Sequence, residues 1–279
     1  MVSVERFVHD EPALFAATRR FVQIMRSVPD PIVFVARKAK NATAQIAWTL
    51  LGTALFQDRL YSGILLLMDA LYKRFPDEKL WELPVPKAKE IEDVVEGVFE
   101  SRNWTVFENV AGIFWSVGLF VRHHPDLELW VRERTPEEMW RDLGEIYFMG
   151  KSSVRPKACA AIYRLLAPAP VGLGFSCRDN LRMPPIPLTM GLRRFLAILG
   201  PAKESSFSEL EPATKQKLAN EYCSALSPEA PYLAAHALQF FLEEGTEDFI
   251  CRECTEKCAR CPLYEFCGYA SHHDKGCVC

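Results

Sequence analysis

The stretch CRECTEKCARCPLYEFC, residues 251–267, holds five of the ten cysteines of this 279-residue chain. Four of them, Cys251, Cys258, Cys261 and Cys267, follow the spacing Cys-x6-Cys-x2-Cys-x5-Cys. Crowded cysteines suggest disulfides in a small secreted domain, but this chain is long and its first residues, MVSVERFVHDEP, lack the uninterrupted apolar segment of a signal peptide. Clustered thiols in a reducing compartment more often bind a metal, so we expect a cytoplasmic metal-binding protein.

Two kinds of metal centre fit four thiolates from one short loop. A [4Fe–4S] cluster needs one soft sulfur ligand for each iron, and the loop must fold back on itself between the ligands. Zinc accepts four cysteines as a tetrahedral site, but the unequal spacing fits two ligand pairs less well. The spacing Cys-x3-Cys-x2-Cys within the stretch also matches radical S-adenosylmethionine enzymes, whose β/α barrel this sequence cannot build. The other potential ligands in the tail have no assigned role: Cys254, Cys277, Cys279, His272 and His273.

The rest of the sequence contains residues typical of helix starts and helix ends. Thr135-Pro136-Glu137-Glu138 combines a capping hydroxyl, a proline at the first helical position and a glutamate three residues after the cap. Ser227-Pro228-Glu229 predicts a second helix start, with a stop near Gly245, and Thr189 predicts a third, with a stop at Gly200-Pro201. There is no run of alternating strand residues. The sequence therefore predicts an all-α fold.

Residues 44–75 and 106–123 are so rich in apolar side chains that we expect their helices to be central. Pro-rich passages at 27–31 and 167–187 suggest boundaries. We accordingly expect four parts. The predicted parts are an N-terminal helical arm (1–40) that packs with the C-terminal lobe, a central helical domain (41–166), a C-terminal helical lobe (167–250) and a cysteine loop with its tail (251–279).

Composition places the chain among globular proteins, with 49% hydrophobic and 25% charged residues. The longest aliphatic run, Ile64 to Met68, is far too short to span a bilayer, so we expect no membrane association. The formal charge of −3 argues against a protein that coats nucleic acid. The charge is unevenly distributed, however, because residues 151–194 contain eight basic side chains and one acid. This basic segment could meet phosphates.

The cysteine spacing and the text CARCPLYEFC resemble the iron–sulfur loop of the endonuclease III and adenine glycosylase family, which belongs to the helix-hairpin-helix DNA glycosylases. The similarity extends weakly from about Ala44 onward. It implies a two-lobed helical DNA glycosylase fold with a C-terminal [4Fe–4S] loop, in which the cluster is mostly structural. It also implies a monomer that binds double-stranded DNA containing a damaged or modified base.

The resemblance assigns roles to individual residues before the basic segment and within it. Gln57 follows AWTLLGTALF and matches the glutamine that enters the DNA stack. In SSVRPKACAAIYRLL, Ser153 and Arg155 occupy the positions of the two hairpin glycines, and without glycine we expect the phosphate-binding turn to be altered. Ser152, Ser153 and Arg155 could still hold a phosphate. Lys157 matches the catalytic lysine that attacks C1′ of the damaged nucleotide.

The largest departure from the family is a missing carboxylate. The family's catalytic aspartate is replaced by Thr189, which can cap a helix but cannot act as a base. Asp179, in a segment longer than the family has, could supply the carboxylate instead. Arg193 and Arg194 follow in the basic segment and are candidate DNA contacts. Aromatic residues that could line a base pocket or belong to the core are Trp104, Trp115, Tyr147 and Phe148.

Two functions follow from the resemblance. The first is a base-excision repair glycosylase, with a possible AP-lyase step at Lys157 and with Asp179 as the acid. The second is a catalytically inactive iron–sulfur relative that binds DNA or a partner. We favour the enzyme because the lysine and the basic segment occur together.

Overall fold

The computed structural model describes residues 3–56, 61–76, 80–81, 87–99, 109–150, 154–175, 183–203, 207–241 and 261–267. Within these ranges the regular secondary structure is helical and contains no strand, which confirms the all-α prediction. None of the described helices combines the length and hydrophobicity that crossing a bilayer requires. The α-helices are α1 (Val4–Asp10), α2 (Pro12–Met25), α3 (Pro31–Ala36), α4 (Ala42–Leu55), α5 (Tyr61–Arg74), α6 (Ala88–Phe99), α7 (Val110–His123), α8 (Leu127–Glu133), α9 (Pro136–Asp142), α10 (Pro156–Leu166), α11 (Met190–Ile198), α12 (Pro212–Leu226) and α13 (Pro231–Leu238). The short 3-10 helices are η1 (Leu143–Glu145), η2 (Phe207–Glu209) and η4 (Tyr264–Phe266).

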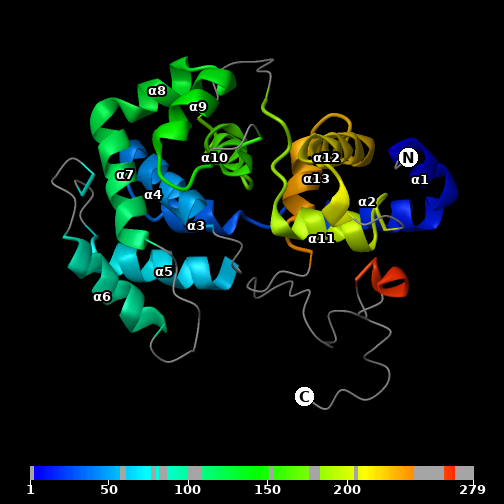
Figure 1. Cartoon of the computed structure of the whole chain (residues 1–279), viewed down its shortest axis with the longest axis horizontal. Helices are drawn as coiled ribbons and strands as arrows, with labels where there is room; N and C mark the ends of the chain where they lie inside the picture. Colours follow the sequence, from blue (N-terminus) through cyan, green and yellow to red (C-terminus); the bar gives the residue numbers. More distant parts are fainter. Residues whose placement is uncertain are drawn as a thin grey trace, which may run out of the picture. The chain divides into compact units, whose positions relative to one another are not determined.

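The chain divides into two compact units (Figure 1). Unit 1 consists of Met1–Val28 and Pro185–Cys279, and unit 2 consists of Pro29–Pro184. The N-terminal segment thus belongs to the same unit as the C-terminal part of the chain. The first division falls after Val28, within the Pro-rich passage 27–31 and before residue 40, where the expected N-terminal part ended, because α3 packs against α4 and α5 in unit 2.

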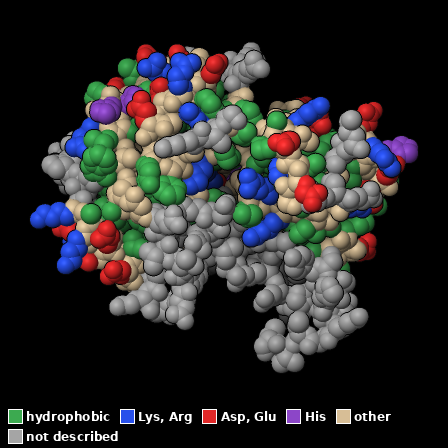
Figure 2. Space-filling view, viewed as in Figure 1, with side chains coloured by type: hydrophobic (Ala, Val, Ile, Leu, Met, Phe, Trp, Pro, Cys, Tyr) green, Lys and Arg blue, Asp and Glu red, His purple; other side chains and the backbone are tan. Residues whose placement is uncertain are grey.

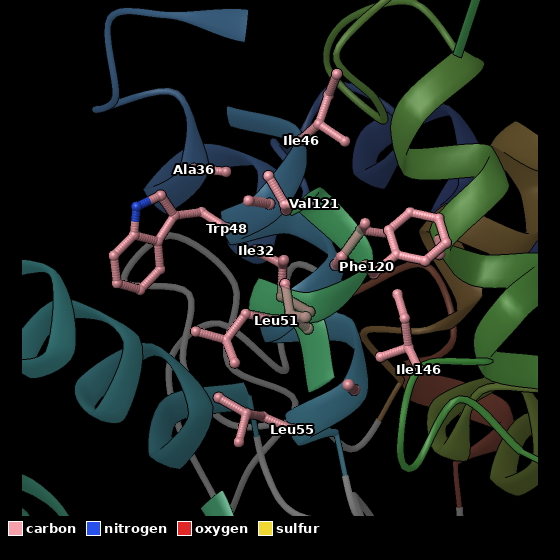
Figure 3. Packing of buried hydrophobic residues seen from close by; sticks show 14 of the residues in the cluster. Ile32, Ala36, Ile46, Trp48, Leu51, Leu55, Phe120, Val121 and Ile146 are labelled. Atoms are coloured by element: carbon pink, nitrogen blue, oxygen red, sulfur yellow. The ribbon is translucent and has the colours of Figure 1, made fainter. Parts of the chain in front are cut away.

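Helix α4 is the centre of unit 2 and packs against α3, α5, α7, α8 and α10. Nearly every side chain between Ala44 and Leu55 is buried, as the dense apolar sequence predicted. Two buried threonines satisfy their hydroxyls within the helix, since Thr49 donates to the Gln45 carbonyl and Thr53 to the Thr49 carbonyl, both at 2.8 Å. Figure 3 shows side chains of this helix among those of its neighbours in the core.

Helix α7 differs from α4 because one of its faces is open. Ile113, Phe114 and Val117 are buried, but Trp115 is 55% exposed. The expectation that this helix is central therefore holds for its buried face, which packs against α4 and α6. Some apolar residues of α7 therefore pack in the core, while Trp115 lies on the surface.

Unit 1 is built on α2, α12 and α13, which pack together, with α1 against α2 and α12. The aromatic ring of Tyr222 lies at its centre, 5.8 Å from the ring of Phe7, 6.2 Å from that of Phe15 and 5.9 Å from that of Phe195. His236 is also buried. Its Nε2 lies 2.6 Å from the Val28 carbonyl, and its Nδ1 lies 2.8 Å from the side-chain amide of Gln239.

Of the three helix starts predicted from the sequence, two are confirmed and one is wrong. Thr135 forms the predicted capping box with Glu138, and Thr189 caps α11 by accepting a hydrogen bond from the Leu192 N–H. The helix predicted to start at Ser227-Pro228 begins only at Pro231, because Ser227 instead ends α12 with its N–H bonded to the Cys223 carbonyl. That helix, α13, ends at Leu238, well before Gly245.

Candidate functional site

Lys157 lies in the first turn of α10, and its side chain reaches the C-terminal end of α4. The Nζ atom donates a hydrogen bond to the carbonyl of Ala54, at a distance of 3.0 Å. Ala54 is the last residue but one of α4, so its carbonyl belongs to the last turn, whose acceptors have no partner within the helix. A cationic side chain at this end of a helix is electrostatically favourable. Two segments 103 residues apart in the sequence are thereby joined.

An aromatic ring lies beside the same amine. The Nζ atom of Lys157 is 5.4 Å from the centre of the Phe148 ring, a cation–π distance. Phe148 has a positive φ of 67°, which is unusual for a bulky residue. Its ring also meets that of Tyr147 edge to face, with the ring centres 4.6 Å apart. The half-buried amine is therefore held between a helix end and an aromatic side chain.

Arg155 adopts the backbone conformation that the sequence analysis considered difficult without glycine. It is the N-terminal cap of α10 and has φ 36° and ψ 64°, in the left-handed region. Its guanidinium lies 4.2 Å from the centre of the Trp140 ring, and its Nη1 donates to the Trp140 carbonyl at 3.1 Å. A non-glycine residue therefore takes positive φ here, where contacts with α9 hold the arginine in place. The expected alteration of the phosphate-binding turn stays a prediction, because Ser153 lies outside the described residues. These contacts engage the guanidinium within unit 2, while its role in phosphate binding stays a prediction.

Gly144 makes room for this arginine. A Cβ atom at Gly144 would lie 2.3 Å from Nη1 of Arg155, far inside any normal contact. The guanidinium therefore occupies the space that a side chain at residue 144 would fill. The turn before α10 depends on a glycine in η1 and an arginine at the cap, rather than on a glycine at the cap itself.

Unit 1 contains the other described candidates for DNA contact. Arg193 and Arg194 lie in α11 and are half-buried. The start of α11 is packed closely, since a Cβ on Gly191 would lie 2.0 Å from the carbonyl oxygen of Gln239. Thr189, at the position of the missing aspartate, uses its hydroxyl oxygen to cap this helix. It has the capping role that the sequence analysis gave it.

The described part of the cysteine loop runs from Cys261 to Cys267. It folds back through η4, in which the Tyr264 N–H bonds to the Cys261 carbonyl at 3.0 Å and the Cys267 N–H bonds to the Tyr264 carbonyl at 3.3 Å. Both cysteines are half-buried, and Leu263 between them is buried. The ligand set proposed from the cysteine spacing stays a prediction. Among the described residues, no three histidine, cysteine or acidic side chains form a metal site, and Cys251 and Cys258 lie outside those residues.

Several predicted site residues also lie outside the described ranges. They are Gln57, Ser152, Ser153 and Asp179. The structure therefore brings Lys157 to the end of the helix that precedes Gln57 and does not place Gln57 itself.

Sequence reasoning missed the contacts that hold the two basic residues of the hairpin. Trp140 under Arg155 carries no recognisable motif, and the Ala54 carbonyl that binds Lys157 is a backbone group without any side-chain signal. Phe148 was noted only as an aromatic residue of the core or of a pocket. No family model, curated protein or solved structure matches this chain.

Proposed function

We propose that the protein is a base-excision DNA glycosylase with AP-lyase activity, in which Lys157 is the nucleophile. The observation that carries the proposal is the contact between the Lys157 amine and the Ala54 carbonyl, 3.0 Å apart. The resemblance assigns the attack on C1′ to Lys157 and the insertion into the base stack to Gln57. Both residues act on one nucleotide only if the start of α10 lies beside the end of α4, which is the arrangement observed in unit 2.

The chemistry requires an amine that is close to the deoxyribose and partly shielded from water. Lys157 must first release a proton, since its contacts with the Ala54 carbonyl and the Phe148 ring favour the ammonium form. The neutral amine then forms a bond to C1′ while the bond between C1′ and the base breaks, and the bonding electron pair leaves with the base, which takes up a proton. Ring opening then gives an iminium linkage between the lysine and the sugar. Asp179 is the carboxylate proposed to move protons in this sequence.

The cysteine loop would hold a [4Fe–4S] cluster through Cys251, Cys258, Cys261 and Cys267. When bound, the cluster supplies a rigid covalent anchor for the loop. The residues of the catalytic step lie elsewhere in the chain. The described turn between Cys261 and Cys267 is compatible with this ligand set.

The second candidate, a non-catalytic DNA-binding relative, is favoured by a specific observation at Thr189. Its hydroxyl caps α11, and threonine has no carboxylate with which to activate an amine or stabilise a cationic sugar. The guanidinium of Arg155 likewise already contacts Trp140, through a hydrogen bond to its carbonyl and a cation–π contact with its ring. A chain in which these contacts replace catalytic groups could retain DNA binding without cleavage.

Borohydride trapping on a duplex that contains an abasic site separates the two candidates. The enzyme should form a covalent protein–DNA adduct that disappears in Lys157→Ala. The matched control is Lys215→Ala, because Lys215 also donates to a backbone carbonyl, that of Ser208 at 2.9 Å, and also lies over a phenylalanine ring at 5.6 Å. The control should form as much adduct as the unmodified protein.

The remaining outcomes are equally informative. DNA binding without any adduct supports the non-catalytic relative. An adduct that persists in Lys157→Ala means that another amine is the nucleophile. If the folded protein does not bind duplex DNA even at low salt, where phosphate contacts are strongest, both candidates are excluded.

A further inference from the structure

Unit 2 carries a pocket of about 400 Å³ on the open face of α7, apart from the Lys157 amine. Figure 2 shows hydrophobic side chains exposed on the side of the molecule where Figure 1 places α7. The pocket lies between α7 and the segment that follows η1. Its chemically distinctive lining residues are Asn109, Trp115, Phe120, His123, Glu145 and Tyr147.

Two of the aromatic side chains are unusually exposed for their size. Trp115 is 55% exposed and Tyr147 is 45% exposed, whereas Phe120 is buried at 2%. Phe120 is packed from behind by His124 and Trp130, with ring centres 4.3 Å and 5.2 Å away. The pocket therefore has a fixed aromatic floor and two accessible aromatic walls.

The wall that carries Tyr147 is attached firmly to α7. The Tyr147 N–H donates to the Ser116 Oγ at 3.1 Å, and that hydroxyl donates to the Ile113 carbonyl at 2.9 Å. The Tyr147 ring is supported by the edge-to-face contact with Phe148. Because the backbone of this wall is already fixed, a ligand would not have to order it on binding.

The charges around the pocket indicate which ligands it accepts. Its described lining includes one carboxylate, Glu145, and no lysine or arginine. Glu145 would repel an anionic ligand, and no lysine or arginine in the described lining would offset that repulsion. Glu145 is exposed, so a neutral apolar ligand would gain no charge pairing from it. A compact organic cation satisfies the carboxylate and the electron-rich faces of the aromatic rings together.

We infer that this pocket binds an alkylated ammonium group, with Trp115 and Tyr147 as the accessible aromatic surfaces, buried Phe120 beneath them and Glu145 as the counter-charge. The same unit already places cations against aromatic rings at two positions, Arg155 on Trp140 and Lys157 on Phe148. The pocket differs from these positions because Trp115 and Tyr147 are exposed and no described lysine or arginine lines it. The site does not depend on the proposed glycosylase activity.

Titration of the full-length protein with tetramethylammonium tests the inference, with the indole N–H signal of Trp115 as the reporter in nuclear magnetic resonance spectra. The signal is assigned to Trp115 if it is missing from the spectrum of Trp115→Phe. We expect saturable binding, and weaker or no binding of the uncharged near-isostere neopentyl alcohol (2,2-dimethylpropan-1-ol), which adds one hydroxyl to the neopentane skeleton. The affinities for choline and for a peptide containing trimethyllysine are then compared. They show whether the pocket binds the ammonium group more tightly in a small molecule or on a protein side chain.

Three variants identify the contributing groups. Trp115→Leu, which lacks the indole reporter and is therefore titrated by calorimetry alongside the unmodified protein, should bind tetramethylammonium about fivefold more weakly because the cation–π contact is lost. Glu145→Gln, which preserves shape and removes charge, should weaken it about threefold. Phe34→Leu alters an aromatic side chain that is 61% exposed on α3 and does not line the pocket, so it should leave affinity unchanged.

Equal affinity for the cation and its uncharged isostere would overturn the inference, as would affinity that is unchanged in Glu145→Gln and Trp115→Leu together. So would a folded protein that shows no saturable binding of tetramethylammonium. Borohydride trapping should be the same in Trp115→Leu and the unmodified protein. This comparison keeps failure of the cation site distinct from failure of the Lys157 chemistry.

Discussion

The guanidinium of Arg164 and the carboxylate of Asp30 form an ion pair inside unit 2, with Arg164 Nε 3.1 Å from each carboxylate oxygen. Their side chains are only 6% and 3% exposed. The Asp30 carboxylate also accepts hydrogen bonds from the N–H groups of Ile32 and Val33 at the start of α3. One carboxylate thus caps α3 and joins it to α10, the helix that carries Lys157.

Removing the charge of Asp30 should strongly destabilise unit 2. Asp30→Asn retains an oxygen that can cap α3 but leaves the buried Arg164 without its counter-charge, so the free energy of unfolding should fall by about 3–5 kcal/mol. Urea denaturation followed by circular dichroism measures the change. The control is Asp69→Asn, in a surface pair with Lys38 at 2.7 Å, which should cost less than about 1 kcal/mol. Equal losses in the two variants would contradict the importance of the buried pair.

The left-handed backbone of Arg155 predicts an order of stability among substitutions. Arg155→Ala and Arg155→Gly both lose the contacts with Trp140, but only alanine retains the steric cost of positive φ. The glycine variant should therefore be more stable than the alanine variant by about 1 kcal/mol, in contrast to an ordinary helical position. Thermal and urea denaturation can rank the two. An alanine variant that is as stable as the glycine variant would show that residue 155 does not have this conformation.

Gly191 should tolerate no side chain, because α11 lies so close to the end of α13. A Cβ would lie 2.0 Å from the carbonyl oxygen and 2.4 Å from the carbonyl carbon of Gln239, and backbone atoms cannot rotate away. Gly191→Ala should lower the free energy of unfolding by at least about 1–3 kcal/mol. Gly97→Ala in α6 is the control, since nothing lies within 4 Å of its Cβ position. It should be neutral or stabilising by up to about 1 kcal/mol, because alanine favours the helix.

Two buried thiols should be unreactive in the folded protein. Burial raises the pKa of the Cys159 and Cys223 thiols from 9.0 to about 12. The protonated form is favoured in the folded state, so this contribution to stability is complete below pH 9.0 and is lost as the pH rises toward 12. At mildly alkaline pH, iodoacetamide should modify these cysteines only after urea is added, as measured by peptide mass spectrometry. Modification of Cys223 in the folded protein would be inconsistent with its burial.

The cysteine loop gives a prediction about metal content. Protein purified without oxygen should contain about four irons per chain and absorb broadly in the blue region. Cys261→Ala should lose iron and colour. Cys223→Ala, which removes a thiol far from the proposed ligand set in the sequence, should keep both. Zinc in place of iron would identify the alternative centre, and metal-free, colourless protein would remove the main support for the family resemblance.

The helical class and two helix starts could be predicted from sequence because they depend on neighbouring residues. The capping box at Thr135 joins groups three residues apart, and so does the cap at Thr189. Ser227 was misread for a related reason. A serine before a proline can start one helix or end another, and the preceding helix α12 decided which.

The candidate site depended on contacts between distant parts of the chain. The resemblance pointed to Lys157, but the Ala54 carbonyl that binds its amine is a backbone acceptor 103 residues away. Residue 155 takes positive φ because Trp140 and the space over Gly144 hold its guanidinium, and neither contact could be read from the local sequence.

The amino-acid sequence alone established the helical architecture, the uneven charge and the spacing of the thiols, since each of these properties is a matter of composition or of short intervals along the chain. Folding in three dimensions decided that α4 ends beside Lys157, that Asp30 meets Arg164 and that α7 leaves Trp115 exposed. The physical reason is that these contacts are selected by packing of the whole unit, in which the free energy of burying many side chains determines where each single polar or aromatic group lies.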